Sequence, residues 1–407
     1  MSPKNFYTPI AVIGIITFLS IVSCHPEEIV NPDSDEQLVE SSYSQPVKGH
    51  YLVILKQGAI NARFSAKGDY PQRTAAMKMA ISPILHRAKI SDAMVEQVFS
   101  STVFGFSGPL EQPMLEKLRM DPEVAYIEQD RLIILAPPWK KKKKDTPNTQ
   151  ETPPGITRVG GALRYTGRNV AWVIDTGIDL DHPDLNVAGN KGFNALTEGE
   201  DAKTLDDGNG HGTHVAGSIA AIDNKIGVVG VAAGATIVPV KVFDLMGKGT
   251  YSGVIKGVDF VAAHARSGDV ANMSLGGPGS LALDEAVLKA SEKGIFFCLA
   301  AGNGSDKAAL RSPARVKGRY VYTVSAMDHN DSWAYFSNFG NPPVDFCAPG
   351  MGIKSTWNDG EYHTISGTSM ATPHVAGVLL LVGEKFQEGG RVHLDPDGNA
   401  DYIMVHR

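Results

Sequence analysis

Hydrophobic runs alternate with helical stretches from Gly155 to the end of the chain. Near-continuous Val, Ile and Leu runs predict buried strands, and longer stretches of helical composition separate them. Strands are predicted at 170–174, 236–243, 270–275, 294–301 and 320–325. Helices are predicted at 211–222, 250–266, 283–293 and 370–386. This alternation is typical of an α/β fold in which helices cover both faces of a parallel sheet.

A separate pattern occupies residues 48–136. Strands are predicted at 51–55, 101–106 and 124–135, and helices at 73–89 and 109–120. The second helix is stopped by Asp121-Pro122. Alternating strands and helices in so short a span favour a small α+β sandwich of ferredoxin-like type.

The N-terminal residues have the layout of an export signal. Lys4 precedes an apolar stretch at 10–22, which is too short to span a bilayer. The predicted organisation is a signal peptide at 1–23, a flexible tether at 24–47, the small domain at 48–136, a linker at 137–154 and the large domain at 155–407. The linker contains the run Lys140–Lys144. A solvated, extended segment and a contact with an anionic surface are both compatible with that run.

Composition excludes only a few classes of protein. Charged residues make up 20% and hydrophobic residues 43% of the chain, as in a soluble globular protein. The net charge of -6 gives no reason to expect nucleic acid as a partner. Three cysteines cannot form a disulfide framework. Cys298 and Cys347 lie in apolar runs and are predicted to be buried strand thiols, although a bond between them is compatible with the sequence.

Three windows carry candidate chemistry. Asp175 ends an apolar strand, His211 opens a helix, and Ser369 lies between a Gly-Thr turn and the start of another helix. A serine hydroxyl is a poor nucleophile at neutral pH and needs a base and an orienting acid. These residues are far apart in the chain, so only folding can bring them together. His214 follows His211 by three positions, but the glutamate of a metalloprotease motif does not accompany the pair.

Taken together, the windows resemble the subtilisin-like serine peptidases in the order Asp, His, Ser. Asn303 closes the stretch Ala300-Ala-Gly-Asn303, which is also similar to that family. The stretches Ala271–Gly276 and Arg311–Val316 are similar to its proteinase K-like members. The resemblance implies that Ser369 attacks the peptide carbonyl while His211 takes its proton and Asp175 orients His211. It also implies an oxyanion hole made by the Asn303 amide and the Ser369 backbone N–H.

The same resemblance implies two edges that hold an extended substrate. One edge is Gly247, Lys248 and Gly249, and the other is Ser274, Leu275 and Gly276. Tyr251 would cover a pocket several residues before the scissile bond. Gly304 follows Asn303, so no acidic wall is expected, and apolar or aromatic side chains are predicted in the primary pocket.

Calcium is the metal that the resemblance implies, and no catalytic cofactor is expected. Oxygen ligands on a loop suit this ion. The implied ligands of the first site are Asp184, Asn224, Gln150 and the backbone carbonyls of Ile222, Ile226 and Val228. A second site is implied at Asp345, with carbonyls near Arg319 and Val321.

Residues 48–136 resemble the inhibitory propeptide of the subtilisin family, on the stretches Phe104–Ser107 and 124–130. The chain after Leu135 would lie in the active site and be cut between Ala136 and Gln150. The alternative is a permanently attached binding domain.

The segment Ile21-Val-Ser-Cys24 resembles the lipobox of bacterial lipoproteins, with Cys24 as the lipidated residue. An ordinary signal peptide is the alternative. We therefore expect an exported serine endopeptidase of the bacterial cell envelope, made as a self-inhibited precursor and held on the membrane by a lipid anchor. It would act on proteins or peptides at the cell surface or after release. The rival expectation is a surface-tethered peptide-binding protein on an inactive peptidase scaffold.

Overall fold

The computed structural model describes residues 43–60, 68–135 and 149–406, which belong to one compact unit. The predicted signal peptide, Cys24 and the Lys140–Lys144 run lie outside the described residues. Within the described ranges, no helix has both the length and the apolar character needed to cross a membrane.

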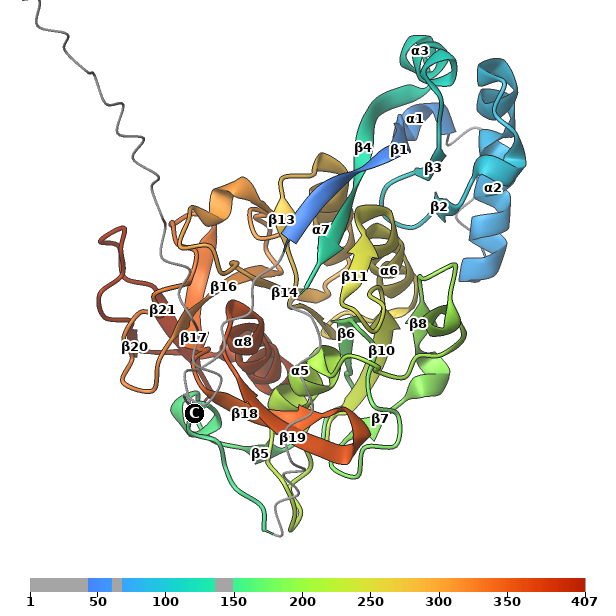
Figure 1. The fold of residues 1–407 in the computed structure, drawn as a ribbon. Coiled ribbons are helices and arrows are strands. Elements are labelled where there is room, and N and C mark those ends of the chain that lie inside the picture. Colours follow the sequence, from blue (N-terminus) through green and yellow to red (C-terminus); the bar gives the residue numbers. More distant parts are fainter. Residues whose placement is uncertain (1–42, 61–67, 136–148, 407) are drawn as a thin grey trace, which may run out of the picture. The chain divides into compact units, whose positions relative to one another are not determined.

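The large domain is built on one twisted sheet of ten strands (Figure 1). All neighbouring strands run parallel except the last hairpin, β20 with β21. In order across the sheet the strands are β20 (Gln387–Arg391), β21 (Tyr402–Val405), β17 (Val344–Pro349), β16 (Val321–Met327), β14 (Phe296–Ala300), β12 (Val270–Met273), β6 (Ala171–Asp175), β10 (Thr236–Lys241) and β7 (Asn186–Val187), with β8 (Phe193–Asn194) also paired to β10. The predicted parallel α/β class is confirmed.

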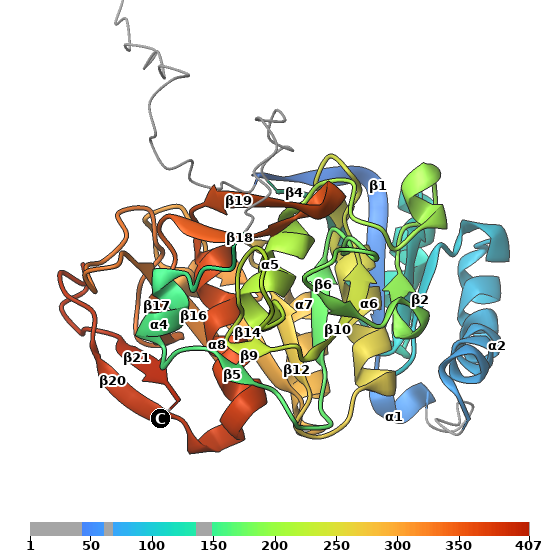
Figure 2. The ribbon, with the colours of Figure 1, turned by 90° about the horizontal axis from the view of Figure 1, so that it is seen from below.

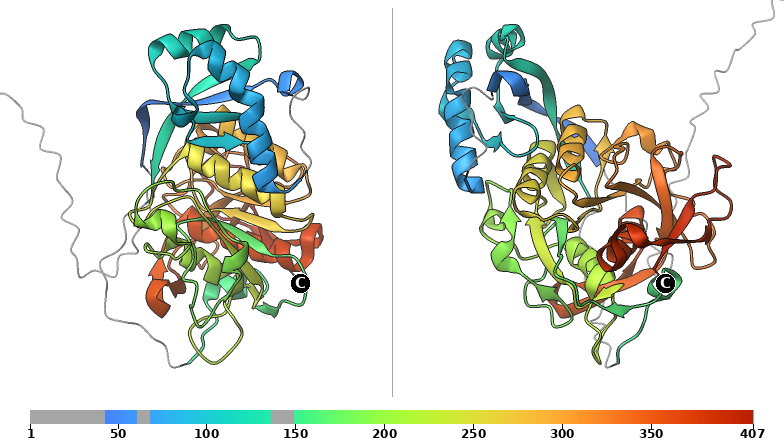
Figure 3. Two further views of the ribbon diagram at one scale, coloured as in Figure 1. Left: turned by 90° about the vertical axis from the view of Figure 1, so that its right-hand side faces the viewer. Right: turned by 180° about the vertical axis from the view of Figure 1, so that it is seen from behind.

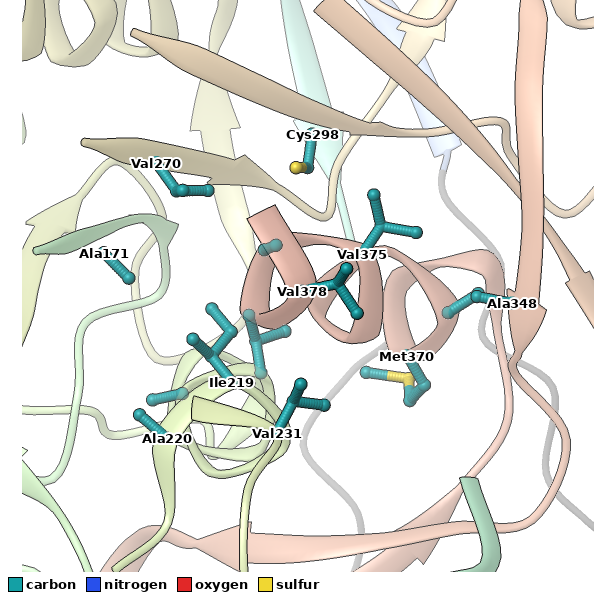
Figure 4. Close-up of a cluster of buried hydrophobic side chains, with 14 of the residues drawn as sticks. Ala171, Ile219, Ala220, Val231, Val270, Cys298, Ala348, Met370, Val375 and Val378 are labelled. Carbon is teal, nitrogen blue, oxygen red and sulfur yellow. The ribbon is translucent and has the colours of Figure 1, made fainter. Parts of the chain in front are cut away.

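Helices cover both faces of this sheet (Figure 2). On one face lie α5 (His211–Ala220) and α8 (Thr368–Val382), and on the other lie α6 (Tyr251–His264) and α7 (Leu281–Ser291). Strand side chains alternate between the two cores: Ala171 and Val173 join the first, and Trp172 and Ile174 join the second. Figure 4 shows Val375 and Val378 of α8 within the first core. Because both faces of the strands are buried, their sequences read as continuous apolar runs.

The small domain is an antiparallel sheet with two main helices on its outer side (Figure 3). Its strands are β1 (Tyr43–Leu55), β2 (Gln97–Phe99), β3 (Gly105–Pro109) and β4 (Val124–Ile134), in the order β4-β1-β3-β2. Its helices are α1 (Gln57–Ile60), α2 (Tyr70–Ala88) and α3 (Gln112–Met120). The inner side of the sheet packs on α6 and α7, since Leu52, Ile54 and Phe99 belong to the same core as those helices.

The remaining α-helix and β-strands of the described chain are short. They are α4 (Pro154–Arg158), β5 (Leu163–Arg164), β9 (Ala232–Ala233), β11 (Lys248–Thr250), β13 (Gly277–Pro278), β15 (Arg311–Ser312), β18 (Ile353–Trp357) and β19 (Glu361–Ile365). The hairpins β18–β19 and β20–β21 were not predicted from the sequence.

Two predictions about the small domain were wrong at their edges. The tether was expected to reach residue 47, but β1 already begins at Tyr43, because residues 43–46 pair with 131–134 of β4. A strand was expected at 101–106, but Ser101–Phe104 form the connection between β2 and β3, and β3 begins at Gly105. The connection is held by a carboxylate of the large domain, which is described below.

Candidate active site

The clearest feature of the site is a buried contact between an imidazole and a carboxylate. His211 Nδ1 lies 2.6 Å from Asp175 Oδ1, and both side chains are almost fully buried. Burial raises the pKa of Asp175, and the neighbouring His211 opposes that rise. Because an ionised carboxylate can only accept hydrogen bonds, it holds the proton of a neutral His211 on Nδ1 and leaves Nε2 as the basic atom.

The local backbone explains why these two residues meet. Asp175 is the last residue of β6 and His211 is the first residue of α5. A Cβ on the next residue, Gly212, would lie 2.1 Å from the carbonyl oxygen of Gly177, so only glycine lets the helix start approach the strand end this closely. The Asp207 carboxylate fixes the turn before α5 by accepting hydrogen bonds from the backbone N–H of Asn209, Gly210 and Thr213, and from side-chain hydroxyls.

Ser369 is the second residue of α8, so the helix begins two residues earlier than the predicted start at residue 370 and includes the serine in its first turn. Its hydroxyl donates to the carbonyl oxygen of Ser274 at 3.3 Å. Asn303 lies beside it: Asn303 Oδ1 accepts hydrogen bonds from the backbone N–H and the hydroxyl of Thr368, both at 2.8 Å. These two bonds fix the orientation of the Asn303 amide, so that its nitrogen points away from Thr368.

A cavity of about 370 Å³ opens in front of Ser369. Its lining includes Asn303, Thr368, Arg311 and the predicted edge Ser274–Gly276. Leu135, the last described residue of the small domain, also lines it. The cavity therefore brings together the predicted nucleophile, the predicted oxyanion donor and the end of the β4 segment.

The two predicted substrate edges differ in what they contact. β11 pairs antiparallel with β4, with Gly249 opposite Ile133, and Leu135 N–H donates to the Gly247 carbonyl at 2.8 Å. The first edge is thus occupied by an extended strand of the same chain. The other edge, Ser274–Gly276, lines the cavity. On its side away from β11, the described part of β4 pairs with β1. Tyr251 is fully buried and donates to the carbonyl of Pro278 at 2.5 Å.

Carboxylates of the small domain bind the first turns of α6 and α7. Glu128 Oε2 accepts hydrogen bonds from the backbone N–H of Leu281 and Ala282, at 3.0 and 3.2 Å. Asp130 accepts from the backbone N–H and the hydroxyl of Ser252, at 3.2 and 2.5 Å. The first N–H groups of a helix lack intrahelical partners and carry partial positive charge, so these contacts favour docking of the small domain.

Asp259 of α6 makes the reverse contact. This fully buried carboxylate accepts hydrogen bonds from three consecutive backbone N–H groups of the small domain, those of Ser100, Ser101 and Thr102. It also accepts from the Tyr70 hydroxyl at 3.1 Å. These bonds explain why Ser101–Phe104 leave the predicted strand.

The first set of predicted calcium ligands comes together in space. Asp184 Oδ1 lies 2.7 Å from Asn224 Nδ2, and Gln150 Oε1 accepts a hydrogen bond from the Asn224 backbone N–H at 2.8 Å. The Ile222 N–H donates to the Asp184 carbonyl, and the Val228 N–H to the Asp184 carboxylate. Among the described residues, the carbonyl oxygens of Ile222, Ile226 and Val228 accept no backbone hydrogen bond.

The chemistry of this cluster fits a cation. Asp184 is fully buried, and burial raises its pKa to about 6. Within the described chain it has no cationic side chain as partner. The described part of the chain contains no group of three or more His, Cys, Asp or Glu side chains that could hold a metal ion. A calcium site here would instead rely on one carboxylate, two side-chain amides and backbone carbonyls, all hard oxygen ligands.

Asp345 is different, and the structure argues against the second calcium site. Its carboxylate forms an ion pair with Lys317 and accepts a hydrogen bond from the Thr323 backbone N–H at 2.9 Å. A lysine ammonium therefore already neutralises the charge that a second calcium ion was expected to bind.

His214, the other histidine of the spaced pair, is a structural residue. It is fully buried, and its Nε2 lies 2.9 Å from the Ile353 carbonyl. Burial lowers its pKa to about 3, so it stays neutral. Cys298 in β14 and Cys347 in β17 are buried free thiols, as predicted.

Sequence reasoning missed three residues of this region. Asp207 follows Asp206 in the window that contains His211, but nothing in the pattern marked its role. Asp259 lies on the buried side of a helix, where an unpaired acid is unusual, and that could have been a signal. Arg311 was noted only as part of a family-like stretch, although it lines the cavity.

Comparisons with known proteins agree with this geometry. Residues 169–402 match the subtilase family and residues 50–136 match the peptidase inhibitor I9 family. The chain is 40% identical over 345 residues to alkaline serine exoprotease A of Vibrio alginolyticus, a match that covers 82% of this chain and 60% of that protein. It is 35% identical over 388 residues to the extracellular serine proteinase of a Thermus species, covering 90% and 88%.

The fold comparison points the same way. The crystal structure of a cold-adapted subtilisin-like serine proteinase matches with a TM-score of 0.52 and 38% identity, covering 62% of this chain and 96% of that one. The chain belongs to the subtilase family, and its class is that of a subtilisin-like serine peptidase. Its small domain is an I9 domain, which we call the I9 module from here on.

Proposed function

We propose that this protein is an exported serine endopeptidase that cleaves peptide bonds through Ser369, His211 and Asp175. The observation that carries the proposal is the buried 2.6 Å contact between Asp175 and His211, together with a cavity that Ser369 and Asn303 share. The stretch Arg311–Val316 supports a place near the proteinase K-like branch of the family.

The geometry supports acyl transfer in steps. The Ser369 hydroxyl exchanges its hydrogen bond to Ser274 for one to His211 Nε2 and attacks the substrate carbonyl carbon, while His211 takes the proton. The charge on the carbonyl oxygen is bound by the Asn303 amide nitrogen and the Ser369 backbone N–H. His211 then gives its proton to the leaving amine, and water hydrolyses the acyl-enzyme by the same route in reverse. Asp175 keeps the imidazole oriented and stabilises its charged form.

The I9 module serves as the inhibitor of the precursor. Its β4 takes the place of an extended substrate on β11, and Leu135 carries the chain to the cavity. The predicted cut between Ala136 and Gln150 would sever the module from the peptidase and leave it bound by Glu128, Asp130 and Asp259. A permanently attached binding domain would serve no purpose in a position that blocks the substrate edge.

Calcium and the lipid anchor remain parts of the proposal. A calcium ion at Asp184, Asn224 and Gln150 would neutralise the buried carboxylate and link the segment before α4 to the loop after α5. The lipobox-like segment ending at Cys24 supports attachment to a bacterial membrane by a lipid. Relatives such as the extracellular Thermus proteinase support export.

The decisive experiment labels the matured protein with a fluorophosphonate, which reacts with activated serines. We expect labelling and casein cleavage in the wild type and neither in Ser369→Ala. Ser218→Ala is the matched control, because Ser218 is also a buried helical serine but lies on α5, away from the cavity lining. If Ser369→Ala still cleaved casein, the assignment of the nucleophile would be wrong.

The rival function, peptide binding on an inactive scaffold, predicts a different outcome. A matured wild-type protein that bound peptides, resisted labelling and released no product would favour it. The close Asp175–His211 contact argues against the rival, since a binding protein has no need of an oriented imidazole.

A further inference from the structure

The cavity in front of Ser369 holds one charged side chain. Of the described residues that line it, Arg311 alone is charged, and the others are glycines, apolar residues, hydroxyl residues and amides. The guanidinium reaches the segment that follows Asn303: a Cβ on Gly304 would lie 3.6 Å from Arg311 Nη2. A cation therefore forms part of the cavity wall directly beside the predicted oxyanion donor.

The backbone of Arg311 is held in place by strand pairing. β15 runs antiparallel to β13, with Arg311 opposite Pro278 and Ser312 opposite Gly277. The Ser312 hydroxyl also accepts a hydrogen bond from the Ser280 N–H at 2.8 Å. β13 continues directly from the cavity edge Ser274–Gly276, so the position of Arg311 is tied to the edge that a substrate would contact.

The existing partner of Arg311 leaves room for a second carboxylate. Arg311 Nη2 lies 3.4 Å from Asp306 Oδ2, and the two side chains are 36% and 41% exposed. A single contact of this length between partly exposed groups is weak. Asp306 is also engaged in its own loop, where its Oδ1 accepts the Lys307 N–H at 2.6 Å. A guanidinium has five N–H donors and binds carboxylates best through two parallel bonds.

We infer that Arg311 makes the primary pocket favour substrates with an acidic side chain, above all glutamate, immediately before the scissile bond. The inference rests on the proposed function, because it names the substrate class of the same site. It replaces the earlier expectation of apolar or aromatic side chains, which was drawn from the lack of an acidic wall and overlooked Arg311. Glutamate is favoured over aspartate because its longer side chain reaches further towards the cavity wall.

The test compares peptides that differ only at the residue before the cut, with glutamate, its neutral isostere glutamine, or leucine. The measured quantity is the ratio of kcat/KM for the glutamate peptide to that for the glutamine peptide. Because both values come from one preparation, changes in overall activity cancel. We expect a ratio of about 10 for the matured wild type, the size of one charge-assisted contact at a partly exposed site. It should fall in 1 M salt.

Variants at Arg311 and at Asp306 should change this ratio of kcat/KM values in opposite directions. Arg311→Gln should bring the ratio close to 1, Arg311→Glu should take it below 1, and Arg311→Lys should retain part of the preference. Asp306→Asn removes the competing carboxylate and should raise the ratio above that of the wild type. If the Arg311 variants do not fold, Asp306→Asn and the salt dependence of the wild type still decide the matter.

A wild-type ratio at or below 1, or a ratio that Arg311→Gln leaves unchanged, would overturn the inference. Failure of the proposed function looks different. In that case the matured wild type would cleave none of the peptides and would not react with the fluorophosphonate. A labelled, active enzyme without a glutamate preference would contradict the role of Arg311 alone.

Discussion

The two helix layers of the main sheet use their N-termini for different partners. On one face, α5 begins with His211 and α8 presents Ser369 in its first turn. On the other face, the first turns of α6 and α7 bind Asp130 and Glu128 of the I9 module. A helix N-terminus attracts negative charge in both cases. In the α5–α8 layer the helix N-termini lie at the candidate active site, whereas in the α6–α7 layer they are bound by carboxylates of the I9 module.

This division means that chemistry and inhibition should respond to different substitutions. The largest effect is expected from Asp175→Asn, which acts on the α5–α8 layer alone. Loss of the orienting carboxylate should lower kcat/KM by about 10⁴-fold, since the imidazole would adopt the wrong tautomer. Inhibition of the variant by the severed I9 module, followed by displacement of a fluorescent peptide, should stay within about twofold. A loss of less than tenfold in kcat/KM would break the comparison.

A second prediction concerns the interior of the same layer. His374 of α8 is fully buried, and burial lowers its pKa from 6.5 to about 4. A lowered pKa contributes stability that is present above 6.5 and is lost as the pH falls towards 4, because the unfolded chain binds the proton first. Between pH 7 and pH 4 this loss amounts to about 3 kcal/mol.

The measurement is the free energy of unfolding in urea across this pH range, made on Ser369→Ala to prevent self-digestion. His374→Gln cannot take up the proton, so its stability should fall less steeply with acid. An unchanged slope would show that His374 does not stay neutral in the folded protein.

The contacts between the I9 module and the first turns of α6 and α7 are tested by the double variant Glu128→Gln, Asp130→Asn. The amide side chains lose the charge that the helix N-termini favour, and inhibition of the matured peptidase by the severed module should weaken by about 30-fold. Glu116→Gln is the matched control, because Glu116 lies exposed on α3 of the same module. Peptide hydrolysis without the module should not change. Equal effects of the double variant and the control would remove the docking role.

The smallest expected effect concerns the loop after α5. Removing calcium with a chelator should lower the melting temperature of the Ser369→Ala protein by about 5 °C, because a buried carboxylate loses its counter-ion. Asp184→Asn should abolish most of this shift. Asp345→Asn should leave it in place, since Asp345 is already paired with Lys317. A chelator without effect on the melting temperature of the Ser369→Ala protein would contradict the calcium proposal.

Local sequence was sufficient to predict the main sheet and the candidate catalytic residues. Buried parallel strands leave continuous apolar runs, and glycine-rich windows place Asp175, His211 and Ser369 at the ends of elements. Both signals are contained in short stretches. The fold class and the positions of these residues could therefore be predicted.

The remaining features depend on contacts between distant segments. The connection at Ser101–Phe104 is shaped by Asp259, more than 150 positions away. Arg311 faces the cavity because β15 pairs with β13, and two-residue strands leave almost no pattern in a sequence. β1 starts at Tyr43 because β4 is there to pair with it, although the segment is polar enough to be taken for a tether.

The pairing of residues 43–46 with 131–134 determines how β1 and β4 would separate under force. β1 and β4 run antiparallel, so Tyr43, the first residue of β1, lies opposite Ile134. Ile134 precedes Leu135, which lines the cavity. Tension applied at the N-terminal end of β1 would separate this ladder one pair at a time, starting with Tyr43 and Ile134. A force on this end of the I9 module would therefore act first on the strand that leads into the cavity.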